Sequence, residues 1–257
     1  MTAHTCHNKE KHLSRKARAA TAQKKEVYVE NTIKLDIAPK SRSIDFDLIP
    51  KTLTQEKYIR NLLDETKNIV VAYGPAGTGK TYLAMLAAIK ALRKGECRKL
   101  VLTRPAVGVE EEEHGFLPGD LNAKMEPWTR PLFDVLREYY PAREITRMLD
   151  EQIVEISPLT FMRGRTLPDA WIIFDEAQNS TVNQMKMLLT RIGANSKIVV
   201  TGDLNQLDRK FCHNNGLLDF IQKTKTTPST RVATVEYTLK DVQRHPVVVE
   251  ILKMYGE

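Results

Sequence analysis

The sequence predicts an α/β fold in which a mainly parallel sheet lies between helices. Short apolar runs rich in β-branched residues recur along the chain, and segments with helical periodicity separate them. This alternation is typical of parallel strands joined by crossover helices. The predicted strands begin at Ile69, Lys99, Glu151, Ala170, Lys197 and Arg231.

Length and composition limit the chain to one such domain with short appendages. It has 257 residues, 42% of them hydrophobic, which is enough for one sizeable core. The net charge of +7 favours an anionic partner, although nucleic acid, nucleotides and other polyanions all satisfy that condition. The odd, widely spaced cysteines (Cys6, Cys97 and Cys212) favour a reducing compartment, and no apolar run is long enough to span a membrane. We therefore expect a cytoplasmic protein without membrane association.

Residues 1–45 are predicted to form a basic, disordered arm ahead of a domain that covers residues 46–257. Lysine and arginine outnumber the acidic residues in this arm, and much of it is polar. Such an arm could tether nucleic acid by neutralising phosphates, or it could act as a solubilising tail. The sequence supports the two interpretations about equally.

The first predicted helix covers residues 53–63, where apolar residues recur at helical spacing directly before the first strand. Gln55 lies at the start of this helix. Because a glutamine amide offers both a donor and an acceptor, Gln55 is a candidate reader of an adenine edge. The alternative is an ordinary surface glutamine on an amphipathic helix.

A phosphate-binding motif follows the strand predicted over residues 69–72. It matches G-x-x-x-x-G-K-[ST], and a helix is predicted over residues 82–93. Glycines let backbone N–H groups wrap a polyphosphate, and the helix directs its positive dipole end at the phosphates. Lys80 would add a charge at the β and γ positions, and the Thr81 hydroxyl would ligate Mg²⁺. The nucleotide-binding candidates are Gly74, Pro75, Ala76, Gly77, Thr78, Gly79, Lys80, Thr81 and Tyr82.

The next two predicted strands cover residues 99–105 and 151–157. Doubly wound sheets bind ligands at the carboxyl ends of their strands, so residues 103–109 are candidates for contacting single-stranded RNA or DNA. The loop or short helix after the second of these strands carries Arg163 and Arg165, which could face phosphates of ATP or of nucleic acid.

A helical segment is expected between these two strands, over residues 126–149. Its periodicity is interrupted in the sequence by Pro127, Pro131 and Pro141. Since proline lacks an N–H group and clashes with the preceding turn, we expect the helix to break at each of the three.

The apolar strand that begins at Ala170 ends in two carboxylates, Asp175 and Glu176. Adjacent acids at the end of a buried strand are costly unless a cation meets them. Asp175 is placed to hold Mg²⁺ through water, and Glu176 is placed to polarise the attacking water. The alternative is an ordinary turn at a strand end, which does not explain why the same chain also carries Lys80 and Thr81 in a phosphate-binding motif.

The last third of the chain supplies two further catalytic candidates. An amphipathic helix is expected over residues 181–192 and a strand over residues 197–200, after which Gln206 could sense the γ-phosphate. A final strand over residues 231–238 precedes Arg244, a candidate arginine finger. The alternative for Arg244 is a surface salt bridge.

Together these motifs resemble the PhoH family of P-loop ATPases, which is related to the helicase core of superfamily 1. The resemblance runs from about residue 53 to residue 253. It rests on Gly-Pro-Ala-Gly-Thr-Gly-Lys-Thr-Tyr-Leu-Ala (74–84), Arg-Pro-Ala-Val (104–107), Gly-Phe-Leu-Pro-Gly-Asp (115–120), Phe-Met-Arg-Gly-Arg-Thr-Leu (161–167), Asp-Glu-Ala-Gln-Asn (175–179), Gln-Met-Lys-Met (184–187), Thr-Gly-Asp (201–203) with Gln206, and Asp-Val-Gln-Arg-His-Pro (241–246).

The resemblance implies a single RecA-like P-loop NTPase domain that hydrolyses ATP, with links to RNA in some members. Many bacterial members carry an extra N-terminal RNA-binding region, and some carry a nuclease domain. Residues 1–45 leave room for neither. The chain therefore resembles the compact versions, including those of phage genomes, which would act in the host cytoplasm.

The expected function is Mg²⁺-dependent ATP binding and hydrolysis coupled to RNA or single-stranded DNA. The first alternative is an ATP-dependent regulatory switch that binds a protein partner and no nucleic acid. A phosphate-loop kinase is a second alternative, although it would need an acceptor site and usually a lid. Unwinding activity, polarity and physiological role do not follow from the sequence.

We also expect a homo-oligomer, in the form of a hexameric ring. A superfamily 1 helicase divides its ATP site between two RecA-like domains, and this chain is long enough for one. Arg244 follows the last predicted strand, in a segment that could project across an interface. We therefore expect Arg244 to act in a neighbouring subunit's site.

Overall fold

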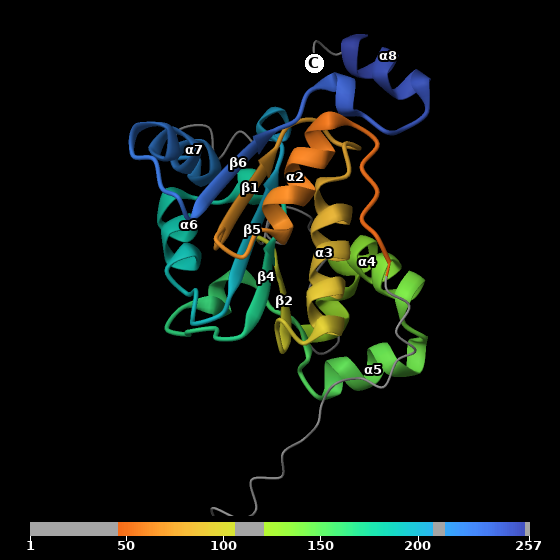
Figure 1. Ribbon diagram of the computed structural model, residues 1–257, viewed down its shortest axis with the longest axis vertical. Helices are drawn as coiled ribbons and strands as arrows, with labels where there is room; N and C mark the ends of the chain where they lie inside the picture. The colour runs from red at the N-terminus through yellow and green to blue at the C-terminus, as the bar shows by residue number, and fades with distance from the viewer. Residues whose placement is uncertain (1–45, 106–120, 208–213, 255–257) are drawn as a thin grey trace, which may run out of the picture. The chain divides into compact units, whose positions relative to one another are not determined.

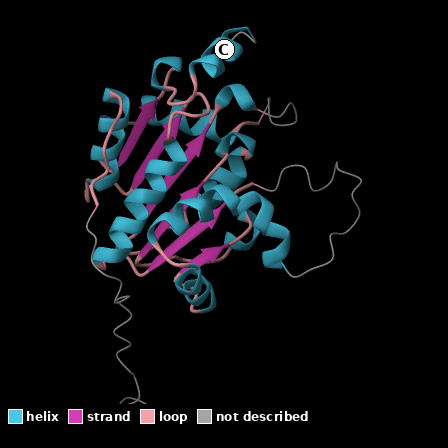
Figure 2. Ribbon diagram, turned by 90° about the vertical axis from the view of Figure 1, so that its right-hand side faces the viewer, coloured by secondary structure: helices cyan, strands magenta, loops and turns pink. Residues whose placement is uncertain are grey.

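One parallel sheet organises the protein. The computed structural model describes residues 46–105, 121–207 and 214–254, so the predicted arm at residues 1–45 lies outside the described residues. In the described chain the strands form one sheet in the order β3-β2-β4-β5-β1-β6, and all neighbours are parallel (Figure 2). These strands are β1 (Ile69–Tyr73), β2 (Lys99–Thr103), β3 (Val154–Ile156), β4 (Ala170–Phe174), β5 (Lys197–Gly202) and β6 (Val232–Glu236). The predicted α/β class is confirmed.

Helices cover both faces of the sheet (Figure 1). They are α2 (Leu53–Leu63), α3 (Lys80–Lys94), α4 (Leu121–Tyr139), α5 (Ala142–Asp150), α6 (Val182–Leu189), α7 (Gly216–Thr226) and α8 (Pro246–Met254). Short 3₁₀ turns are η1 (Leu159–Met162), η2 (Ala177–Asn179), η3 (Leu204–Gln206) and η5 (Leu239–Asp241). Helices α2 to α5 pack in one core, and α6, α7 and η1 in the other. No helix of the described ranges is long and apolar enough to cross a bilayer.

Strand β1 shows how the two cores fix the register of the sheet. Val70 and Ala72 belong to the core under α2 and α3, whereas Val71 and Tyr73 belong to the core under α6 and α7. Alternate side chains of a strand point to opposite faces, so a slip by one residue would exchange the two sets. The fixed register brings the carboxyl ends of the parallel strands to one edge of the sheet.

Helix α4 runs through two of the three prolines that were expected to break it. Pro127 and Pro131 lie within the continuous helix Leu121–Tyr139, and only Pro141, at the N-cap of α5, coincides with a break. The expectation was wrong at the first two positions because packing outweighs the loss of a hydrogen bond at each. Leu132 and Leu136, on the same helix, are buried against the core.

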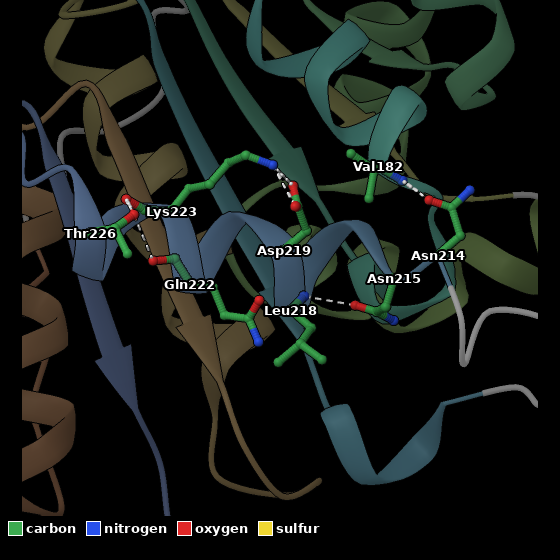
Figure 3. A network of polar contacts seen from close by, with 8 residues as sticks. All are labelled: Val182, Asn214, Asn215, Leu218, Asp219, Gln222, Lys223 and Thr226. Atoms are coloured by element: carbon green, nitrogen blue, oxygen red, sulfur yellow. Dashed lines mark hydrogen bonds and ion pairs between the residues drawn. The ribbon is translucent and has the colours of Figure 1, made fainter.

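Helix α7 is tied to α6 and to the end of β4 through its first residues (Figure 3). Asn215 caps α7, because its Oδ1 accepts a hydrogen bond from the Leu218 N–H at 2.7 Å. Its Nδ2 donates to the carbonyl oxygen of Gln178 at 2.6 Å, and Asn214 Oδ1 accepts from the Val182 N–H at 3.4 Å. The helix therefore holds η2, the turn that follows the two carboxylates of β4.

A cluster of charged side chains lies on the edge strand β3. Lys99 Nζ donates to Glu155 Oε2 at 2.7 Å, and Arg165 Nη2 donates to the same oxygen at 2.9 Å. Arg165 Nη1 contacts the other oxygen, Oε1. These contacts, led by the Arg165 hydrogen bond, lower the pKa of Glu155 to about 2, although burial acts in the opposite direction.

This cluster predicts a pH-dependent contribution to stability. Since the folded pKa of Glu155 is depressed, its contribution is full above the unfolded pKa and is lost as the pH falls toward about 2. Its upper limit is about 3 kcal/mol. Thermal unfolding of Glu155→Gln should show the largest deficit from wild type near neutral pH, and the deficit should shrink steadily as the pH falls through about 2. The matched control Glu151→Gln removes an exposed acid that pairs with Arg147. A deficit that persists unchanged to low pH would contradict the ion-pair explanation.

Candidate nucleotide-binding site

The loop between β1 and α3 depends on glycine at several points. Gly74, Gly77 and Gly79 have φ angles of 130°, 76° and 85°, in the region that side chains disfavour. A Cβ atom on Gly74 would also lie 2.3 Å from the carbonyl oxygen of Tyr237, the residue after β6. The glycines therefore allow both the loop conformation and the close approach of a neighbouring segment.

Lys80 places a buried ammonium at the centre of this loop. Its Nζ donates to the carbonyl oxygens of Gly74 at 2.6 Å and Pro75 at 2.7 Å. Burial lowers the pKa of Lys80, while the carboxylates of Asp203, Asp175 and Glu176 act to raise it. A cation in front of a helix N-terminus, with three carboxylates near it, suits a metal-neutralised polyphosphate.

The two proposed metal ligands, Asp175 and Thr81, lie in direct contact. Asp175 Oδ1 accepts hydrogen bonds from Thr81 Oγ1 at 2.8 Å and from Thr201 Oγ1 at 2.6 Å. The hydroxyl and the carboxylate are hard oxygen donors of the kind that Mg²⁺ prefers, so these side chains fit the ion. Sequence analysis placed Thr201 in the stretch 201–206 suited to sensing the γ-phosphate, and the structure shows its hydroxyl bonded to Asp175.

Both carboxylate oxygens of Glu176 are held by other side chains. Oε1 lies 3.1 Å from Nη2 of Arg104, which follows β2, and Oε2 accepts a hydrogen bond from Gln178 Nε2. Glu176 also has a φ of 52°, which is uncommon for a residue with a side chain. The backbone turn and the two contacts therefore fix where this carboxylate points.

Gln178 links the ends of β4 and β5 and was not assigned by sequence analysis. It is 1% exposed, and its Oε1 accepts a hydrogen bond from the Asp203 N–H at 3.0 Å. Asp203 Oδ2 is buried without a hydrogen-bond partner among the described residues. The sequence offered one signal for this role: a glutamine placed two residues after the pair of acids that ends β4.

One cavity of about 360 Å³ gathers most of the predicted site. It is lined by Ala76, Gly77, Gly79, Lys80, Thr81, Tyr82, Arg104, Pro131, Asp175, Glu176, Gly202, Asp203, Gln206 and Arg244. All four catalytic candidates, Lys80, Glu176, Gln206 and Arg244, are in this set. Tyr82 is 42% exposed at the cavity, and its hydroxyl donates to Glu138 Oε2 at 3.2 Å.

Arg244 lies against the phosphate-binding loop of its own chain. A Cβ atom on Gly77 would be 2.7 Å from Arg244 Cδ, and the Gln243 N–H donates to the Gly77 carbonyl oxygen at 2.9 Å. Arg244 thus lines the cavity of its own chain, and its action in a neighbouring subunit's site stays a prediction. The turn after β6 folds back over the loop because β6 is the neighbour of β1 in the sheet.

Gln55 has a different place from the one expected of a base reader. Its Nε2 donates to the Thr78 carbonyl oxygen at 3.0 Å, and its Oε1 accepts from the Lys51 N–H at 2.7 Å. The side chain is buried, and the residue is not in the cavity lining. Gln55 therefore braces the loop from α2, and the structure gives no support to adenine reading by its amide. Thr78, which is fully buried and donates to the Pro75 carbonyl oxygen at 3.0 Å, also supports the loop.

Comparison with known proteins identifies the family. The family model described as PhoH-like protein matches residues 47–256. The chain belongs to the PhoH-like protein family. It is 44% identical over 207 residues to a PhoH-like protein of Bacillus subtilis (strain 168), with 80% of this chain and 63% of that relative covered. It is 36% identical over 213 residues to Protein PhoH of Escherichia coli (strain K12), with 81% and 58% covered.

This PhoH-like chain thus spans roughly three fifths of the length of the curated relatives it matches. Among solved structures, the UvsW helicase from bacteriophage T4 aligns with a TM-score of 0.43 and 11% identity, over 74% of this chain and 60% of that one. Family membership and the cavity together establish a P-loop NTPase fold with a candidate nucleotide site.

Proposed function

We propose that this PhoH-like chain binds ATP with Mg²⁺ and hydrolyses it. One observation supports the proposal: Lys80, the Thr81–Asp175 pair and Glu176 line a single cavity, and these side chains suit phosphate binding, metal binding and water activation. The competing reaction is transfer of the phosphoryl group to a small acceptor by a phosphate-loop kinase, which would need an acceptor site and usually a lid.

Each step of ATP hydrolysis is assigned to separate residues of the cavity. Loop N–H groups, the N-terminus of α3 and Lys80 bind the phosphates. Thr81 and Asp175 would hold Mg²⁺, which would neutralise charge on the phosphate oxygens. Glu176 accepts a proton from the attacking water, while Gln206 and Arg244 face the developing charge. Arg104 and Gln178 each contact one oxygen of Glu176, and the second lone pair of either oxygen can accept the proton.

Two substitutions test the assignment. Lys80→Ala and Glu176→Gln should each abolish phosphate release in the absence of any added acceptor, because one removes the phosphate-binding cation and the other the proton acceptor. Glu176→Gln should retain nucleotide affinity, measured by titration with a fluorescent ATP analogue. Lys57→Ala and Glu56→Gln make the same changes on the exposed side of α2 and are the controls. Normal turnover by Glu176→Gln would show that another group accepts the proton.

Arg244 is proposed as an arginine finger that acts within its own chain. Arg244→Ala should slow hydrolysis by about 10³- to 10⁵-fold and leave ATP binding intact. A mixture of Arg244→Ala and Lys80→Ala proteins should stay inactive, since each chain lacks part of its own site. Recovery of activity in the mixture would instead show that the finger serves a neighbouring subunit.

Coupling to RNA or single-stranded DNA and assembly into a hexameric ring are further proposals. The net charge of +7 supports an anionic partner. Residues 106–109 of the segment expected to contact nucleic acid lie outside the described residues, and Arg104, at the described end of that segment, lines the ATP cavity. The competing function is an ATP-dependent switch that binds a protein partner. Stimulation of hydrolysis by RNA would favour the first function, and its absence with every polynucleotide would favour the second.

A further inference from the structure

Two of the motifs that the nucleotide site does not use meet at a second groove. The segments 161–167 and 184–187 are separated in the sequence, but η1 and α6 lie side by side on the face of the sheet away from α3. Between them is a groove of about 660 Å³. Its lining residues are Leu159, Thr160, Arg163, Asn183, Gln184, Lys186, Met187 and Thr190.

Packing explains the apolar side chains of this region. Leu159 and Met162 of η1 and Met185 and Leu188 of α6 are buried in the core beneath the groove. Packing does not explain the exposed polar side chains. Arg163 on one side and Asn183, Lys186 and Thr190 on the other are exposed, and the three helix residues form one stripe at helical spacing.

The groove has a net positive charge, and hydrogen bonds from Arg191 join its two sides. Arg165 is neutralised by Glu155, but no ion pair joins Arg163 or Lys186 to any residue that the structure describes. The lining contains no acidic side chain. Arg191 fixes the spacing of the two walls, because its Nε donates to the Met187 carbonyl oxygen at 3.1 Å and its Nη1 to the Arg165 carbonyl oxygen at 3.2 Å.

We propose that this groove binds the sugar-phosphate backbone of a single-stranded nucleic acid. Cations, amides and hydroxyls are the side chains that contact phosphates and sugars. Phe161 of η1 is 57% exposed, but it lines a different cavity, with Phe133 and Arg165, and takes no part in this groove. The inference rests on the proposed nucleic-acid coupling and assigns it a site away from the sheet edge.

The groove is connected to the ATP site through the chain itself. Helix α6 starts at a capping box, in which the Gln184 N–H donates to Thr181 Oγ1 at 3.2 Å and the Thr181 N–H donates to Gln184 Oε1 at 2.9 Å. This cap directly follows η2, whose Gln178 holds Glu176. A nucleic-acid strand bound along α6 would therefore contact the helix that follows η2, the turn that carries Gln178 beside Glu176.

The test is the salt dependence of binding to labelled oligouridylate and oligothymidylate, measured by fluorescence anisotropy. Each phosphate contact with a single strand contributes about 0.7 to the slope of log affinity against log salt, so Arg163→Ala with Lys186→Ala should reduce the slope by about 1.4.

The matched control removes two exposed lysines elsewhere, Lys57→Ala with Lys225→Ala, and should leave affinity and slope close to wild type. ATP-analogue affinity should be unchanged in every variant, which verifies folding. Equal slopes for wild type and the Arg163/Lys186 variant would overturn the proposal that nucleic acid binds in this groove, while leaving nucleic-acid coupling intact. If the wild type binds neither oligonucleotide, or if polyglutamate competes as well as RNA, the groove proposal fails and the ATPase assay still stands on its own.

Discussion

The buried ammonium of Lys80 is the constraint on which the rest of the site depends. Removing a lysine from water is costly unless acceptors and opposite charges surround it. Here the carbonyl oxygens of Gly74 and Pro75 accept its hydrogen bonds, and Asp203, Asp175 and Glu176 supply the opposing charge. Those carboxylates come from β4 and β5, so the sheet order brings them to the loop.

The carboxylates in turn need fixed positions, and a second set of contacts provides them. Gln178 holds Glu176 and the backbone of Asp203, and Asn215 at the start of α7 holds Gln178. Arg104 approaches Glu176 from the end of β2. The ends of three strands and one helix therefore set the direction of a single carboxylate. This role explains why Gln178, Asp203 and Asn215 are buried at an edge built from apolar strands.

Local patterns predicted the elements and the chemistry, because they depend on neighbouring residues. The apolar run before Gly74 and the acids after β4 identify a strand end by themselves. The errors came where distant contacts decide. Pro131 stays helical because α4 packs on the sheet, and Gln55 bonds to the Thr78 carbonyl oxygen rather than lining the cavity.

Arg244 shows the same limit. Its role as a finger candidate came from its place in a motif, but its contact with Gly77 follows from β6 lying beside β1, which no local pattern reveals. The pairing of Arg104 with Glu176 likewise requires the order of β2 and β4 in the sheet. Side-chain partners across a parallel sheet are thus fixed by topology, whereas strand positions are fixed by composition.

The most direct measurement is a crystal structure with Mg²⁺ and a non-hydrolysable ATP analogue. The account predicts that Lys80 Nζ exchanges at least one carbonyl partner for a phosphate oxygen at about 3 Å, with the metal between the phosphates and the Thr81–Asp175 pair. Contradiction would be a nucleotide bound elsewhere, with Lys80 still donating to both Gly74 and Pro75.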